Sequence, residues 1–199
     1  MKKSILFIFT ACFLFTTSCS DFLDEEHKTK YSSEYVFGTP EGLKLAVNAL
    51  YALQRYYAND TENATIFALE RGTDLAVTNG GTGNFYGIYD PNYLKPSASQ
   101  VGFMWRTMYQ IIGKANEIIA AAEDLEDTPS LRATVSEAKC FRAQSYFLLY
   151  RTFDRIWLNI QPTTAENVND PRDFHAASEK EVFDLIYEDL EYAITNLDW

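Results

Sequence analysis

One stretch of the sequence concentrates side chains that suit sugar binding. Four aromatic residues alternate there with four amide or carboxylate residues: Phe85, Tyr86, Tyr89 and Tyr93, with Asn79, Asn84, Asp90 and Asn92. Sugar C–H groups pack on aromatic faces, while sugar hydroxyls hydrogen-bond to amides and carboxylates. We predict a ligand surface in which Tyr86, Tyr89 and Tyr93 offer the aromatic faces. Asn84 and Asp90 are expected to reach the ligand hydroxyls.

The segment that carries these residues is predicted to be a long loop. Residues 78–99 contain turn-forming residues throughout and show no helical or strand periodicity. Loops of this length are uncommon in compact domains unless they have a function. The alternative is that the aromatic residues fold back on one another as a small core of the loop itself, and the sequence leaves both interpretations open.

Motifs of catalysis are missing from the chain. It has no nucleophile elbow, no HExxH, no paired CxxC and no GxxxxGK. The glycine-rich stretch at residues 79–84 lacks the lysine and the following helix that a phosphate loop needs. Glu70 and Asp74 lie four residues apart, but a solvated or salt-bridged helix face explains them better than a pair of catalytic carboxylates. We therefore expect no enzymatic activity.

Composition and charge narrow the classes of ligand. The chain has 199 residues, of which 47% are hydrophobic, enough for the core of one domain. Its net charge of -11 would repel nucleic acid and anionic lipid. His27 and His175 have no ligand set nearby, and the acidic run at residues 123–127 lacks the spacing of a calcium loop. We expect neither a metal nor another cofactor.

The N-terminus has the features of an exported protein. Lys2 and Lys3 precede an apolar run, residues 5–15, which is too short to span a bilayer but suits a secretory signal peptide. Acidic residues follow at once. Ser18 is the small residue that cleavage before Cys19 requires.

Cleavage before a cysteine resembles processing at the bacterial lipobox, in which the new N-terminal cysteine is lipidated. Thr16 departs from the leucine usual at that position. We expect a signal peptide over residues 1–18, lipidation of Cys19, and an acidic leader over residues 19–38. Cys140 would then have no partner for a disulfide within the chain. The alternative is an ordinary signal peptide with an incidental cysteine.

Residues 39–199 are predicted to be all-α. Apolar residues at helical spacing predict helices that begin at Pro40, Val101 and Pro129 and after Ser178, and a shorter helix over residues 64–77. Thr39, Thr128 and Ser178 are expected to cap three of these helices, the last through a capping box with Glu181. The apolar stripe of the first helix is expected to contain Leu43, Val47, Leu50 and Tyr57. The apolar face of the helix from Val101 is expected to contain Trp105, Met108, Ile112, Ala115, Ile119 and Ala122, with Trp105 largely buried, and that of the last helix includes Leu190. The short acidic turn at residues 123–128 predicts that its two flanking helices pack antiparallel.

Helix hairpins in series raise the question of repeats. WRTMYQII from Trp105 and AQSYF from Ala143 resemble the packing positions of tetratricopeptide helices, although no strict period near 34 residues holds. We predict tetratricopeptide-like stacked helix hairpins with long loops. The chain ends at Trp199 soon after the last helical residue, and we expect it to be a fragment of a larger domain.

Four segments together resemble the N-terminal part of SusD/RagB-family outer-membrane lipoproteins. They are CSDFLDEE, MWRTMYQIIGKANEII, EAKCFRAQSYFLLYRTF and VFDLIYEDLEYAITNL, in the order of the family. After Phe153 the chain departs from the family, because DRIWLNI stands where the family usually has a glycine and then Pro-Leu.

The resemblance implies a lipoprotein of the cell outer membrane, facing outward through its lipid anchor. Such a protein binds nutrient oligosaccharides and passes them to a SusC-like TonB-dependent transporter, breaking no bond. Two alternatives stay open. One is a peptide-binding surface lipoprotein of the same fold, and the other is a secreted hydrolase whose catalytic residues lie in a missing part.

We predict that Cys19→Ala releases the protein from the membrane or stalls its processing. Each buried methylene of an acyl chain contributes roughly 0.8 kcal/mol, and stable attachment needs more than one chain, so loss of the lipidated cysteine removes the anchor. Membrane fractionation with a labelled fatty acid checks this. Continued lipid labelling of the variant would contradict the assignment.

Overall fold

The structure is a computed structural model that describes residues 31–59, 99–164, 167–171 and 174–197. The predicted signal peptide, most of the predicted leader and the short helix expected over residues 64–77 lie outside the described residues. The described helices belong to one compact unit, Ser33–Trp199. None of them is both long and apolar enough to cross a membrane.

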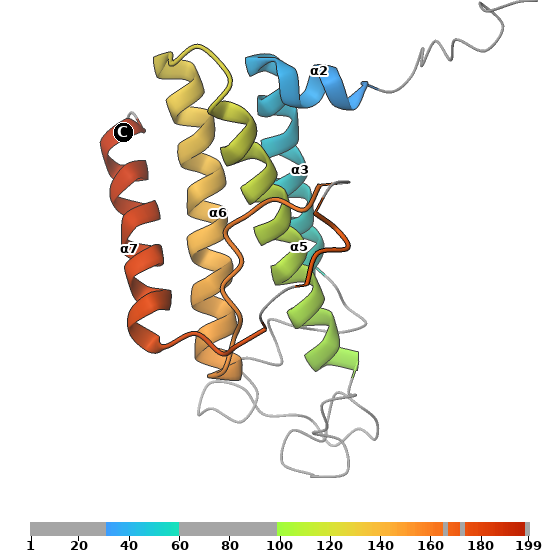
Figure 1. Cartoon of the computed structure of the whole chain (residues 1–199), viewed down its shortest axis with the longest axis vertical. Coiled ribbons are helices and arrows are strands. Elements are labelled where there is room, and N and C mark those ends of the chain that lie inside the picture. Colours follow the sequence, from blue (N-terminus) through green and yellow to red (C-terminus); the bar gives the residue numbers. More distant parts are fainter. Residues whose placement is uncertain (1–30, 60–98, 165–166, 172–173, 198–199) are drawn as a thin grey trace, which may run out of the picture. The chain divides into compact units, whose positions relative to one another are not determined.

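The described residues form five α-helices and no strand, which confirms the all-α prediction. They are α2 (Ser33–Gly38), α3 (Pro40–Asn59), α5 (Ser99–Ala122), α6 (Pro129–Phe153) and α7 (Glu179–Asn196). Figure 1 shows the four longer helices side by side, with α6 between α5 and α7. Because α6 contacts α3, α5 and α7, it is the central helix of the unit.

All three predicted caps are present. The N–H of Gly42 donates to Oγ1 of Thr39 at 3.0 Å, and the N–H of Leu131 donates to Oγ1 of Thr128 at 3.1 Å. At α7, Ser178 and Glu181 form the reciprocal capping box. Each cap satisfies helix-end N–H groups that have no partner within the helix and is worth about 1 kcal/mol.

Helix α2 was not anticipated from the sequence. It lies at the end of the stretch assigned to the leader and packs on the start of α3. The contact requires a glycine at position 42, because a Cβ atom there would lie only 2.2 Å from the backbone oxygen of Tyr35. The absence of a side chain at Gly42 therefore permits the two helices to meet so closely.

Helices α5 and α6 pack antiparallel, as predicted (Figure 1). Trp105, near the start of α5, contacts Phe153 at the end of α6, with ring centroids 5.0 Å apart. Asn116, eleven residues further along α5, contacts Arg142, eleven residues earlier on α6. Trp105 itself is only partly buried at the edge of the core, whereas its neighbour Met104 is buried.

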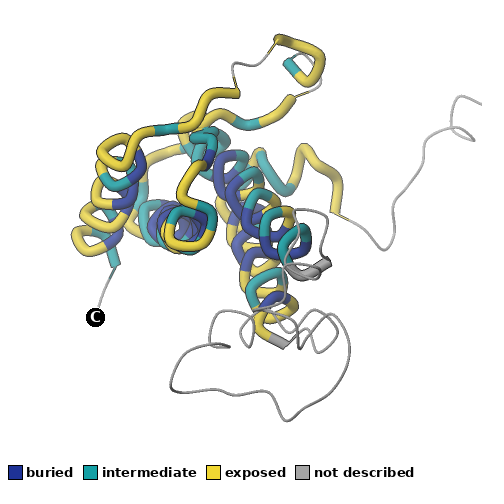
Figure 2. The backbone as a smooth tube through the Cα atoms, turned by 90° about the horizontal axis from the view of Figure 1, so that it is seen from below, coloured by how far each residue is buried: buried dark blue, intermediate teal, exposed yellow. Residues whose placement is uncertain are grey.

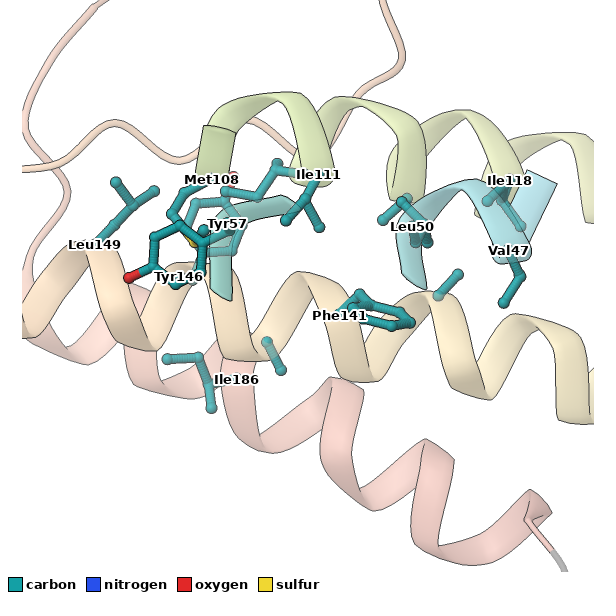
Figure 3. Packing of buried hydrophobic residues seen from close by; sticks show 14 of the residues in the cluster. Val47, Leu50, Tyr57, Met108, Ile111, Ile118, Phe141, Tyr146, Leu149 and Ile186 are labelled. Carbon is teal, nitrogen blue, oxygen red and sulfur yellow. The ribbon is translucent and has the colours of Figure 1, made fainter. Parts of the chain in front are cut away.

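The core fills the space between α6 and its neighbours. The residues coloured as buried lie on the inward faces of the helices (Figure 2), and Figure 3 shows side chains of α3, α5, α6 and α7 all contributing to the core. The stripe read from the sequence of α3 is correct, since its predicted members are buried: Leu43, Val47, Leu50 and Tyr57. On α5 the buried face is wider than predicted, because α3 and α6 both pack on it, and it includes Ile111 and Ile118.

One prediction for α7 is wrong. Leu190, expected on the apolar face, is 38% exposed, and the neighbouring Asp189 is fully buried in its place. The reason is an ion pair: Oδ2 of Asp189 lies 2.7 Å from Nε of Arg142, and Oδ1 lies 2.8 Å from Nη2 of the same guanidinium. Lys139 adds a third contact at 2.8 Å. A buried carboxylate is tolerated only when it is paired and hydrogen-bonded in this way.

The ion pair also reaches α5. Nη1 of Arg142 donates to Oδ1 of Asn116 at 2.8 Å, and Asn116 is itself buried. A single guanidinium therefore binds side chains of both helices that flank α6. We refer to Asn116, Lys139, Arg142 and Asp189 as the buried polar cluster.

We predict that Asp189→Asn destabilises the protein by about 3–5 kcal/mol, because it leaves two buried cations without their counter-charge. The matched control is Asp184→Asn on the same helix, whose ion pair with Lys180 is exposed to solvent. That change should alter the free energy of unfolding by no more than about 0.5 kcal/mol. Denaturant unfolding followed by circular dichroism compares the two, and equal effects would contradict the prediction.

Candidate functional site

The ligand residues predicted from the sequence lie outside the described residues. This holds for Asn84, Tyr86, Tyr89, Asp90 and Tyr93, and also for Cys19. Their roles therefore stay predictions.

A pocket is present in the connection between α6 and α7. The connection begins at Asp154, whose φ of 61° is unusual for a residue other than glycine. It then runs back along α5 and α6 (Figure 1). The N–H of Ala177 donates to the backbone oxygen of Ile156 at 2.8 Å, so the two ends of the connection meet at its base.

Two tyrosine hydroxyls hydrogen-bond to the first part of this connection, one from the partly buried Tyr109 and one from the buried Tyr146. The hydroxyl of Tyr109 accepts from the N–H of Trp157 at 3.0 Å and donates to its backbone oxygen at 2.8 Å. The hydroxyl of Tyr146 makes the same pair of bonds with Asn159, both at 2.8 Å. Burial raises the pKa of Tyr146 and of Tyr109 above the ordinary value, which keeps both hydroxyls protonated as donors.

The buried polar cluster supplies a third side chain that hydrogen-bonds to the backbone of this connection. Because Oδ1 of Asn116 accepts from Arg142, the Nδ2 group of the same amide is directed to the backbone oxygen of Asn159, which lies 2.7 Å away. The wall of the pocket is thereby connected through Asn116 and Arg142 to the buried carboxylate of Asp189.

The pocket has a volume of about 390 Å³ and is open to solvent. The residues that line it come from two parts of the connection: Trp157, Leu158, Asn159, Ile160, Gln161 and Pro162, with Asn167, Asp170 and Pro171. The ring of Trp157 stacks on Tyr109, with centroids 6.3 Å apart and planes at 26°. Phe174, which is 71% exposed, contacts Trp157 with centroids 4.7 Å apart.

The polar lining residues divide into two kinds. Asn167 is structural, because its side chain accepts from the N–H of Thr164 at 2.8 Å and donates to the backbone oxygen of Pro162 at 3.0 Å. The side chains of three others make no hydrogen bond with any described part of the chain: Asn159, Gln161 and Asp170. The pocket therefore combines an aromatic surface with polar groups that are not used by the fold.

Neither a metal centre nor a nucleophile–base pair is formed by the lining residues. No group of three or more His, Cys, Asp or Glu side chains that could hold a metal ion occurs among the described residues. Cys140 is partly buried on α6, and burial together with the nearby Asp189 carboxylate raises the pKa of its thiol. A raised thiol pKa makes Cys140 a poor nucleophile.

Neither this pocket nor the buried polar cluster was predicted from the sequence. The pocket residues lie in a polar connection without periodicity, and the signal available for them was the unusual DRIWLNI segment with a tryptophan at position 157. For the buried polar cluster, the signal was the helical spacing of Asp189. It lies three residues after Ile186 and four before Ala193, on an otherwise apolar helix face. A lone acid at such a site requires a buried cation nearby.

The sequence matches known proteins over nearly the whole chain, and the fold matches solved structures over a smaller share of it. A family described as SusD-like, starch-binding and associating with the outer membrane, matches residues 21–198. The chain belongs to the SusD-like family. Its helices accordingly have the tetratricopeptide-like arrangement of SusD-like proteins, which confirms the resemblance read from the sequence.

Two relatives are similar over nearly all of this SusD-like chain. A SusD-like protein of Bacteroides ovatus is 26% identical over 99% of the chain and 35% of its own length. SusD-like protein P2 of Formosa agariphila is 29% identical over 97% of the chain and 38% of its own length. The chain thus spans little more than a third of the length of these relatives.

Solved structures of SusD-like proteins share this fold. A laminarin-binding SusD-like protein is 25% identical with a TM-score of 0.65, over 79% of this chain and 34% of that protein. A SusD-like carbohydrate-binding protein of Bacteroides fragilis is 18% identical with a TM-score of 0.63, over 82% of this chain and 33% of that protein. At the latter identity the likeness concerns the fold alone.

We predict that Tyr146→Phe destabilises the protein by about 1–3 kcal/mol, because the N–H of Asn159 loses its partner and stays partly buried. The ring remains, so packing is unchanged. Tyr187→Phe on α7 is the control, since Tyr187 is 59% exposed. Denaturant unfolding gives the stability, and hydrogen exchange at the amide of Asn159 should accelerate only in Tyr146→Phe. Unchanged exchange would mean that the hydroxyl does not hold this segment.

Proposed function

We propose that this SusD-like chain is part of a surface lipoprotein that binds nutrient oligosaccharides and delivers them to a SusC-like TonB-dependent transporter. The observation that carries the proposal is the family match over residues 21–198. The mechanism is capture without bond cleavage. A ligand that contacts the lipoprotein better when it covers the transporter shifts the pair toward the closed state.

Two similar structures support a glycan as the ligand. One is named as a laminarin-binding SusD-like protein, and the other, with a TM-score of 0.59 to this chain, was solved with a xylogluco-oligosaccharide. The second is 21% identical, so its likeness concerns the fold and its ligand only suggests a probe. Residues Asn84, Tyr86, Tyr89, Asp90 and Tyr93 are the contacts that we propose in the loop.

The localisation that we propose rests on the features of the N-terminus. We propose cleavage after residue 18, lipidation of Cys19, a leader to residue 38 and a helical SusD-like region from residue 39 onward. The lipid is the proposed anchor in the outer membrane, and the acidic leader accompanies export to the cell surface. The tetratricopeptide-like helices would face the transporter, and the loops would form part of the ligand site.

We predict that Tyr86→Ala combined with Tyr89→Ala weakens glycan affinity at least several-fold in the full-length protein. Stacking on one aromatic ring is worth about 0.5–1.5 kcal/mol beyond the burial of area, so two losses should be measurable while neither alone abolishes binding. Titration calorimetry with the tightest glycan of a panel measures the change. Circular dichroism should show the helical signal intact.

Tyr187→Ala is the control for that experiment, because it removes an exposed tyrosine from a described helix. Unchanged affinity in the double variant would assign Tyr86 and Tyr89 to the loop's own packing and leave the function standing. Binding of peptides in place of glycans would overturn the ligand class. Hydrolysis of a bound oligosaccharide by the full-length protein would establish the hydrolase alternative.

A further inference from the structure

We propose that the pocket between Trp157 and Pro171 is a subsite for one neutral sugar unit of the bound oligosaccharide. It is made of different residues from the loop that carries Tyr86 and Tyr89. The inference rests on the proposed function, since it concerns the same class of ligand. It is carried by the described residues of the connection between α6 and α7.

The aromatic part of the pocket is held in place before a ligand arrives. Trp157 stacks on Tyr109 and contacts Phe174, and both of its backbone polar groups are bonded to the hydroxyl of Tyr109. A ring fixed from several directions loses little conformational freedom when a ligand packs on it. Such a rigid, half-buried indole is suited to the apolar face of a sugar.

The polar part of the pocket has hydrogen-bonding capacity to spare. The amides of Asn159 and Gln161 each provide donors and an acceptor, and the carboxylate of Asp170 provides acceptors. None of these three side chains bonds to another described residue. Sugar hydroxyls both donate and accept, so they match a mixed set of this kind better than an apolar or a purely cationic ligand would.

The position of Asn159 is determined by the core. Its N–H and backbone oxygen are bound by Tyr146, and Asn116 donates a further hydrogen bond to the same oxygen. The side chain therefore projects from a backbone that is held on both of its polar groups. This pre-organisation distinguishes the pocket from an ordinary surface depression.

The volume and charge of the pocket define the ligand further. A pocket of about 390 Å³ is at the small end of the range of roughly 300–1,000 Å³ found for ligand sites, and it is open. It suits one unit of a chain that continues into solvent. The negatively charged Asp170 is the only charged residue among the described lining residues, and the whole chain has a net charge of -11. Both facts disfavour acidic sugars and favour neutral ones.

The primary test is Gln161→Ala combined with Asp170→Ala in the full-length protein. Both side chains are exposed and unused by the described fold, so folding should be unaffected. The matched control is Val168→Ala combined with Asn169→Ala, two exposed neighbours that do not line the pocket. Calorimetry uses laminari- and xylogluco-oligosaccharides as neutral probes and oligogalacturonate as the acidic probe.

We expect the pocket variant to lose at least about fivefold in affinity for a neutral probe, as the loss of two ligand hydrogen bonds implies, while the control equals the wild type. Trp157→Ala should lower the affinity for the neutral probe about 2- to 12-fold. Trp157→Phe should lower it less, because phenylalanine keeps an aromatic face. The pocket variant makes the test independent of any effect of Trp157→Ala on folding.

The outcomes separate this inference from the proposed function. If the wild type binds a neutral probe and the pocket variant binds it as tightly as the control does, the subsite is overturned and the function stands. If the wild type prefers oligogalacturonate, the neutral class is overturned. If the wild type binds no glycan at all, both proposals are overturned.

Discussion

The arrangement of this helical unit depends on one buried carboxylate. Asp189 has no exposed surface, and its two oxygens accept from Lys139 and from two nitrogens of Arg142. Transfer of a carboxylate from water into a protein interior costs several kcal/mol, which is offset only when the partners are in place. Lys139 is buried as well, with its side chain only 11% exposed, and its Nζ also lies over the ring of Tyr192, 5.1 Å from the ring centroid. The pair is therefore stable only when α6 and α7 are correctly aligned.

This requirement gives the ion pair a role that apolar packing cannot have. The burial of Leu, Ile and Met side chains is non-directional and would tolerate a shift of one helix along its neighbour. Charge-assisted hydrogen bonds are directional, and the guanidinium fork matches a carboxylate in one geometry. We infer that Arg142 sets the register of α7 on α6. Through Asn116 it also sets the distance to α5 and the path of the segment that follows α6.

The same interactions explain how a helical unit can hold a pocket on irregular backbone. The connection after α6 has few backbone partners of its own, but three side chains from α5 and α6 hydrogen-bond to Trp157 and Asn159. These hydrogen bonds to the helices of the core therefore restrain the backbone that forms the pocket wall. Such a site suits the capture role that we propose, because affinity then comes from several modest contacts rather than from one deep cavity.

Much of the fold follows from local sequence. Thr39, Thr128 and Ser178 cap the helices because each is a short polar residue followed by a first turn that it can bond, and the apolar stripe of α3 is buried because only one of its faces meets the core. Features that depend on a residue distant in sequence could not be predicted in this way. Asp189 is buried and Leu190 is exposed because Arg142, 47 residues earlier in the chain, lies opposite Asp189. Patterns among sequence neighbours carry no information about that contact. Likewise the pocket arises from Tyr109, Asn116 and Tyr146, which are ordinary helix residues until the tertiary structure brings the chain after α6 back across them. Helical periodicity and caps depend on residues that are neighbours in sequence. The burial of a charge, and the position of a loop backbone hydrogen-bonded by side chains of other helices, depend on residues that are neighbours only in space.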